Sequence, residues 1–163
     1  MQQFLRHPRF VPALLFFGGA LPLVVAYGSQ LLLGLHPCHF CLLQRYPYAL
    51  PLLLGFIAWL RPQQVRLAAW LGGAGILASG LLGLYHTAIE RGWVTYTGDC
   101  VAQAAGDRSL DALRAAIAQA PVVACNEVSA ALLGLSMASW NVVWAALVLA
   151  LLVRHYPMQG ANQ

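Results

Sequence analysis

Four long stretches of this 163-residue chain are almost free of charged residues, and each is long enough to cross a lipid bilayer. A helix needs about 20 apolar residues to span a hydrocarbon core of roughly 30 Å. The predicted spans are residues 12–33, 42–60, 67–86 and 128–153. Arg45, in the second span, is the one charged residue within these four ranges. Because 60% of the chain is hydrophobic and only 9% is charged, a soluble domain of this size could not bury so much apolar surface.

The sequence therefore predicts an all-α membrane protein, with residues 1–163 forming a single integral membrane domain built as a four-transmembrane-helix bundle. Two loops, residues 34–41 and 87–127, would lie on the same side of the membrane. The second loop is long and contains "SLDALRAAIAQ", in which Ser109 can cap a short helix and Leu110, Leu113 and Ile117 share one face. This amphipathic helix could rest on the bilayer surface or pack on the ends of the spans.

The arginines predict the orientation of the bundle. The chain contains no lysine, so its formal net charge of +4 is carried by arginine, and no basic run suggests nucleic acid as a partner. The short connections with most positive charge usually face the cytoplasm, and here they hold Arg6, Arg9, Arg61, Arg66 and Arg154. We expect a multi-pass protein of a bacterial inner membrane, with both termini in the cytoplasm and the two loops in the periplasm.

All four cysteines fall in the two predicted periplasmic loops. Cys38 and Cys41 lie in the first loop, and Cys100 and Cys125 lie in the second. In an oxidising compartment such a distribution favours disulfides over metal-bound thiolates. The sequence therefore predicts disulfide chemistry on the outer side of the membrane and no metal.

Cys38 and Cys41 form a C-x-x-C pair directly before the second span. A nearby cation or helix N-terminus stabilises a thiolate, and we expect both at Cys41, because Arg45 follows one helical turn later. A structural disulfide is the simpler alternative. Zinc is a second alternative, but it needs four ligands, and His36 and His39 are the only other local candidates.

Cys100 and Cys125 are separated by 24 residues. A bridge between them would close a medium loop and could simply stabilise the fold by about 3 kcal/mol. A C-x-x-C pair on the same side favours thiol–disulfide exchange between the two pairs instead.

Arg45 and His86 are polar residues at the outer ends of apolar spans. A charge inside a membrane is costly and indicates a function by default, although Arg45 could also extend its guanidinium to the headgroups. His86 ends the third span and could reach the same layer, or it could be an ordinary interfacial residue.

Several motifs together resemble one known family. "PCHFC" followed by "LLQRYPY", "YHT" at the end of the third span, and "CNEVSAALLGLSMASWN" around the last cysteine are similar to segments of the DsbB family. These proteins are bacterial inner-membrane disulfide bond formation proteins, and the resemblance covers essentially the whole chain.

The resemblance implies an oxidoreductase that reoxidises a periplasmic DsbA-like thiol oxidase and passes its electrons to the membrane quinone pool, either ubiquinone or menaquinone. It implies redox-active disulfides Cys38–Cys41 and Cys100–Cys125. Cys100 would form the mixed disulfide with the carrier and Cys125 would exchange with Cys38. Cys41 would then be the thiolate that faces the quinone.

By the same resemblance, Arg45 would assist quinone binding, and His86 and Gln30 would line the quinone site. A cation near a quinone oxygen would stabilise its developing negative charge. The alternative is a non-enzymatic membrane protein whose two disulfides only staple its outer loops, and a third hypothesis is a metal or haem carrier.

Overall fold

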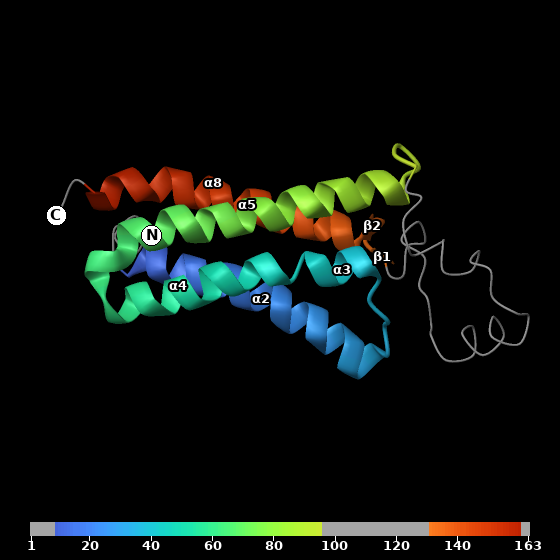
Figure 1. The fold of residues 1–163 in the computed structure, drawn as a ribbon, viewed down its shortest axis with the longest axis horizontal. Helices are drawn as coiled ribbons and strands as arrows, with labels where there is room; N and C mark the ends of the chain where they lie inside the picture. Colours follow the sequence, from blue (N-terminus) through green and yellow to red (C-terminus); the bar gives the residue numbers. More distant parts are fainter. Residues whose placement is uncertain (1–8, 96–130, 161–163) are drawn as a thin grey trace, which may run out of the picture.

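A computed structural model of the chain describes residues 9–95 and 131–160 (Figure 1). Its helices are α2 (Phe10–Leu33), α3 (His39–Leu43), η1 (Tyr46–Tyr48), α4 (Ala49–Leu60), η2 (Pro62–Gln64), α5 (Val65–Glu90) and α8 (Met137–Gly160). A small antiparallel hairpin joins β1 (Ala131–Leu132) to β2 (Leu135–Ser136). Cys100, Cys125 and the predicted amphipathic helix lie outside the described residues.

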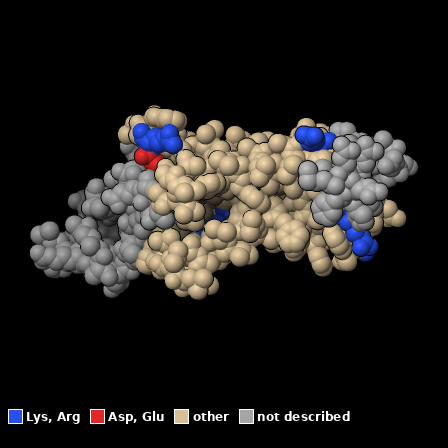
Figure 2. Space-filling view, turned by 180° about the vertical axis from the view of Figure 1, so that it is seen from behind, with Lys and Arg blue, Asp and Glu red and all other residues tan. Residues whose placement is uncertain are grey.

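The predicted four-helix membrane fold is confirmed. Four segments are long and apolar enough to cross a membrane: Phe10–Leu33, His39–Leu60, Pro62–Glu90 and Met137–His155. They lie side by side, and the start of α2, the α4–α5 connection and the end of α8 share one end of the bundle (Figure 1). Charged side chains lie near the two ends of the face in Figure 2, with an almost uncharged band between them. The protein is therefore an integral membrane protein.

Helices α2 and α4 approach each other closely because glycines remove the side chains between them. A Cβ atom on Gly55 would lie 2.4 Å from the backbone nitrogen of Phe16, and one on Gly19 would lie 2.7 Å from the backbone nitrogen of Leu52. Small residues commonly permit this contact in membrane bundles, where packing rather than water exclusion holds helices together.

The second half of α2 diverges from the other helices (Figure 1). Pro22 lies inside α2, and a proline has no N–H to donate to the carbonyl four residues earlier, so it bends or breaks a helix. That carbonyl belongs to Gly18, and the indole N–H of Trp144 on α8 donates to it at 3.0 Å. Trp144 thus satisfies the carbonyl that the proline leaves open.

The second membrane segment is interrupted between α3 and α4. Pro47 lies in the short 3₁₀ helix η1. The Tyr48 N–H donates to the backbone carbonyl of Arg45 at 3.1 Å rather than to the Gln44 carbonyl expected in an α-helix. The Gln44 carbonyl instead accepts a hydrogen bond from the Ser79 hydroxyl at 2.7 Å. This interruption places Gln44 and Arg45 at a turn beside α5.

Several helix ends differ from the ends of the predicted spans, and three of them bear on the site. The second segment becomes helical at His39 rather than residue 42, and α5 continues to Glu90 rather than residue 86. Glu90, assigned to the long loop by the sequence analysis, is therefore helical. Helix α8 begins at Met137 rather than residue 128, because the hairpin turns at Leu133 and Gly134, whose φ angles are 54° and 78°.

Replacing Gly55 should separate α2 from α4. We expect Gly55→Ala to destabilise the protein by about 1–3 kcal/mol, because its Cβ overlaps backbone atoms that cannot move alone. Thermal unfolding of the detergent-solubilised protein measures the effect. Gly28→Ala is the matched control, since its Cβ would meet no atom within 4 Å and alanine is the better helix former. Equal melting temperatures for the two variants would contradict the proposed role of this contact.

Candidate functional site

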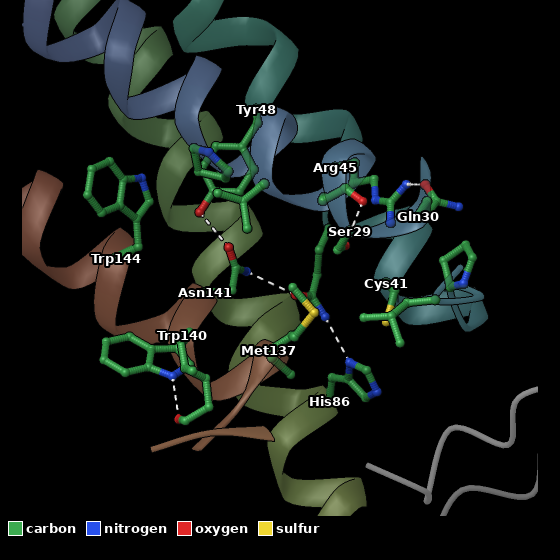
Figure 3. Close-up of a pocket in the computed structure, with 18 of the residues that line it drawn as sticks. Ser29, Gln30, Cys41, Arg45, Tyr48, His86, Met137, Trp140, Asn141 and Trp144 are labelled. Carbon is green, nitrogen blue, oxygen red and sulfur yellow. Dashed lines mark hydrogen bonds between the residues drawn. The ribbon is translucent and has the colours of Figure 1, made fainter. Parts of the chain in front are cut away.

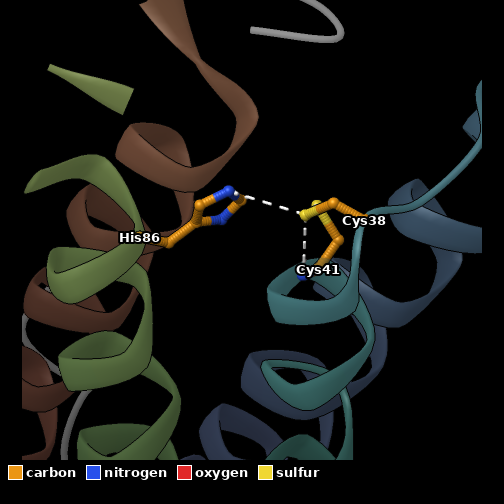
Figure 4. A group of neighbouring side chains, drawn as sticks. All are labelled: Cys38, Cys41 and His86. Atoms are coloured by element: carbon orange, nitrogen blue, oxygen red, sulfur yellow. Dashed lines mark hydrogen bonds between the residues drawn. The ribbon is translucent and has the colours of Figure 1, made fainter. Parts of the chain in front are cut away.

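The C-x-x-C pair lies at the start of α3. The Sγ atoms of Cys38 and Cys41 are 2.8 Å apart (Figure 4). Cys38 is buried in a small apolar cluster with Phe40 and Ile89, whereas Cys41 is half-buried. The two sulfur atoms are therefore adjacent but have different surroundings.

The sequence predicted that a helix N-terminus would favour a thiolate at Cys41, and the structure adds that Cys38 is the residue that caps this helix. Cys38 is the N-cap residue of α3, and its sulfur accepts a hydrogen bond from the Cys41 backbone N–H at 3.3 Å. The helix begins earlier than predicted, which puts Cys41 inside its first turn. Because a helix N-terminus stabilises negative charge, the Cys38 sulfur receives this stabilisation directly.

His86 on α5 completes the group around the pair. Its Nε2 atom lies 3.5 Å from the Cys38 sulfur and 3.8 Å from a carboxylate oxygen of Glu90 (Figure 4). Its ring is buried and packs 5.7 Å, centroid to centroid, from the ring of Phe40. His86 therefore lies directly beside the C-x-x-C pair.

A cavity of about 360 Å³ lies beside the pair, and residues of α2, α3, α5 and α8 line it. Most of its lining is apolar, and Trp140, Trp144 and Met137 of α8 form part of its wall (Figure 3). Its polar lining includes Ser29, Gln30, Cys41, Gln44, Arg45, Tyr48, His86, Glu90 and Asn141. Cys41 reaches this space from α3, and the size is that of a small-molecule site.

Arg45 and Gln30 meet at the cavity. The Arg45 guanidinium donates to the Gln30 side-chain oxygen, and its carbon lies 4.9 Å from the centre of the Tyr27 ring (Figure 3). The Arg45 Nε atom is buried and has no hydrogen-bond partner among the described residues. A buried guanidinium nitrogen without a partner favours a ligand that carries an acceptor oxygen.

A chain of buried and half-buried polar side chains runs from Tyr48 to His86 (Figure 3). The Tyr48 hydroxyl donates to Asn141 at 2.6 Å, and the Asn141 amide donates to the Gln44 side-chain oxygen at 3.0 Å. The Gln44 amide nitrogen lies 3.0 Å from His86 Nδ1. The chain joins α3, α5 and α8 and ends at the residue that contacts Cys38.

The structure also bears on the zinc alternative. Donor atoms of Cys38, Cys41 and His86 lie within 4.8 Å of one another, and the group contains neither His36 nor His39. A structural zinc site has four ligands. Among the described residues three such donors are assembled, and the two histidines considered from the sequence are not among them.

Five candidate residues named from the sequence lie close together in the structure: Cys38, Cys41, Arg45, His86 and Gln30. Gln44, Asn141, Tyr48, Ser79 and Glu90 were missed. The available signal was polarity within apolar spans, because amides inside a membrane segment are costly, and both Gln44 and Asn141 lie in such segments.

A comparison with protein-family models identifies the family of this chain. The family model described as "Disulfide bond formation protein DsbB" matches residues 8–154. An uncharacterized protein of Rickettsia prowazekii (strain Madrid E) is 25% identical over 123 residues, which cover 74% of this chain and 72% of that protein. No solved structure matches the chain significantly.

Proposed function

Because the chain belongs to the DsbB family of disulfide bond formation proteins, we propose that it oxidises a periplasmic DsbA-like thiol oxidase and transfers the electrons to membrane quinone. The net reaction converts a protein dithiol and a quinone into a disulfide and a quinol. Family membership supports a disulfide-generating oxidoreductase, and the geometry of the site supports the quinone as acceptor.

The observation that carries the proposal is that Cys41 and Arg45 line the same largely apolar cavity within a membrane bundle. A quinone ring needs an apolar space that opens from the hydrocarbon layer, together with a donor for its oxygen. The unpartnered Nε atom of Arg45 fits that requirement. A bound quinone would supply a two-electron, two-proton acceptor there.

Arg45, Gln30 and Cys41 would share the work at this cavity. The Arg45 guanidinium would hold a ligand oxygen and stabilise negative charge that develops on it. Gln30 would position Arg45, since it accepts a hydrogen bond from the guanidinium. Cys41 would be the thiolate that releases electrons, because it is the cysteine of the pair that lines the cavity.

Electrons would reach Cys41 by thiol–disulfide exchange. The carrier thiolate would attack Cys100, and the Cys125 thiolate so released would attack Cys38, which frees Cys41 as a thiolate. The second thiolate of the carrier would then displace Cys100 and release the carrier as a disulfide. The Cys100 thiolate would attack Cys125 and free Cys38, so each exchange forms one disulfide and breaks another, and two electrons move without a metal.

We further propose that the cysteines face the periplasm of a bacterial inner membrane. Arg9, Arg61, Arg66 and Arg154 belong to segments at the end of the bundle opposite the C-x-x-C pair (Figure 1). Cytoplasmic connections carry an excess of positive charge, which supports cytoplasmic termini.

The thiol relay predicts a complete loss of turnover when either pair is broken. We expect Cys41→Ser and Cys100→Ser to reduce the rate of quinone loss, with a reduced DsbA-like carrier and a soluble quinone, to the rate without protein. Leu31→Ala is the control, because Leu31 is exposed on α2 and outside the pair. Turnover that survives either serine substitution would sink the mechanism.

Arg45 should act on quinone binding rather than on exchange with the carrier. We expect Arg45→Met to raise the KM for quinone by about tenfold or more, the effect of removing one charged hydrogen bond. Disulfide exchange with the carrier, measured in a single turnover without quinone, should be unchanged. Arg91→Met is the control, since Arg91 is exposed, and an unaltered quinone KM in the Arg45 variant would contradict the assignment.

A further inference from the structure

We propose that Gln44 and Asn141 are positioning residues that hold His86 as the neutral tautomer protonated on Nε2, with this N–H directed at the Cys38 sulfur. The inference rests on the proposed function, and it assigns to two membrane amides a part in the thiol chemistry.

The orientation of the Asn141 amide is fixed by its neighbours. Its Nδ2 lies 3.1 Å from the backbone carbonyl of Ser79, which can only accept a hydrogen bond. Its Oδ1 accepts the Tyr48 hydroxyl at 2.6 Å. Exchanging the oxygen and nitrogen of Asn141 would place its oxygen against the Ser79 carbonyl oxygen, so the NH₂ group must face Ser79.

The same NH₂ group fixes Gln44. Asn141 Nδ2 lies 3.0 Å from Gln44 Oε1, and the opposite orientation of Gln44 would bring two NH₂ groups face to face. Gln44 therefore presents its own NH₂ group to His86 Nδ1, at 3.0 Å. A nitrogen that accepts a hydrogen bond carries no proton, so the His86 proton lies on Nε2.

The surroundings of Nε2 agree with this assignment. Nε2 faces the Cys38 sulfur at 3.5 Å and a Glu90 oxygen at 3.8 Å, and both are acceptors. The Ser136 hydroxyl donates to the other Glu90 oxygen and holds that carboxylate in place. Among the described residues, the other titratable or charged groups around this space are Cys41, Arg45, His36 and Tyr48.

The N–H of His86 would serve the step that regenerates the C-x-x-C disulfide. In that step the Cys38–Cys41 bond forms, and the dithiol gives up two electrons and two protons, which leave on the quinol. Cys38 must act as a thiolate. Its sulfur would accept hydrogen bonds from the Cys41 backbone N–H and from His86 Nε2, so His86 would be a fixed donor and not a general base.

The tautomer can be measured directly. In the full-length, detergent-solubilised protein with ¹⁵N-labelled histidine, the His86 signals are identified by their loss in His86→Gln. We expect wild type to show a protonated Nε2 and an unprotonated Nδ1. Gln44→Met and Asn141→Leu should each give a mixture of tautomers, whereas Gln64→Met, an exposed glutamine in η2, should leave the wild-type pattern.

A second readout follows the Cys38 thiolate. In a Cys41→Ser background with the Cys100–Cys125 bridge oxidised, the pH profile of Cys38 alkylation reports how well its thiolate is stabilised. At pH values below the midpoint of that profile, we expect Gln44→Met to lower the alkylation rate by about fivefold, the effect of one hydrogen bond. Gln64→Met should leave the rate unchanged. Thermal unfolding of each variant separates this effect from loss of the fold.

The outcomes separate the two proposals. If wild type reduces quinone but His86 is protonated on Nδ1, or if folded Gln44→Met and Asn141→Leu keep both the wild-type tautomer and the wild-type alkylation profile, the inference is overturned. If wild type fails to reduce quinone with a reduced carrier, the proposed function is overturned, and the catalytic meaning of the tautomer falls with it. The inference and the proposed function are both supported if wild type is active and shows the expected tautomer, and if Gln44→Met and Asn141→Leu lose that tautomer.

Discussion

A backbone carbonyl inside a membrane must find its hydrogen-bond donor within the protein, because lipid offers none. Two interrupted helices meet this constraint beside the cavity. The carbonyl of Gly18 is left open by Pro22 and is satisfied by Trp144, and the Gln44 carbonyl released at the α3–α4 break is satisfied by Ser79. In each case the donor belongs to another helix. The interruptions that make room for a ligand therefore also link α2 to α8 and α3 to α5 through hydrogen bonds.

The same reasoning explains why the polar chain is continuous. A buried amide without partners costs about 1–3 kcal/mol, and a partly satisfied network is worse than an apolar contact. Tyr48, Asn141, Gln44 and His86 satisfy one another in sequence. The amide groups of such a chain have little rotational freedom. Turning one of them by 180° would place two donors or two acceptors against each other at its neighbour. The rigidity of the site thus follows from the cost of burying polar groups in a membrane bundle.

Much of the architecture could be predicted from residue types alone, but the side-chain contacts of the candidate site could not. The lengths of the apolar stretches predicted the four spans, and the polarity of Arg45 and His86 near the ends of spans made them candidate site residues. Gln44 and Asn141 are separated by 97 residues, so their meeting depends on how α3, α5 and α8 pack. The break after Arg45 follows from Pro47, but the capping role of Cys38 depends on where α3 begins. That boundary is set by local geometry, which hydrophobicity does not specify.

The two sulfurs of the C-x-x-C pair meet chemically different surroundings although they are adjacent. Cys38 is buried, caps α3 and faces His86, whereas Cys41 lines the apolar cavity with Arg45. A sulfur surrounded by N–H donors is suited to carry negative charge while it waits to re-form a bond. Cys41 is the member of the pair that shares the cavity with Arg45, so it is the sulfur placed to pass electrons to a ligand there. The division of roles proposed for the pair therefore has a physical basis in these two different surroundings.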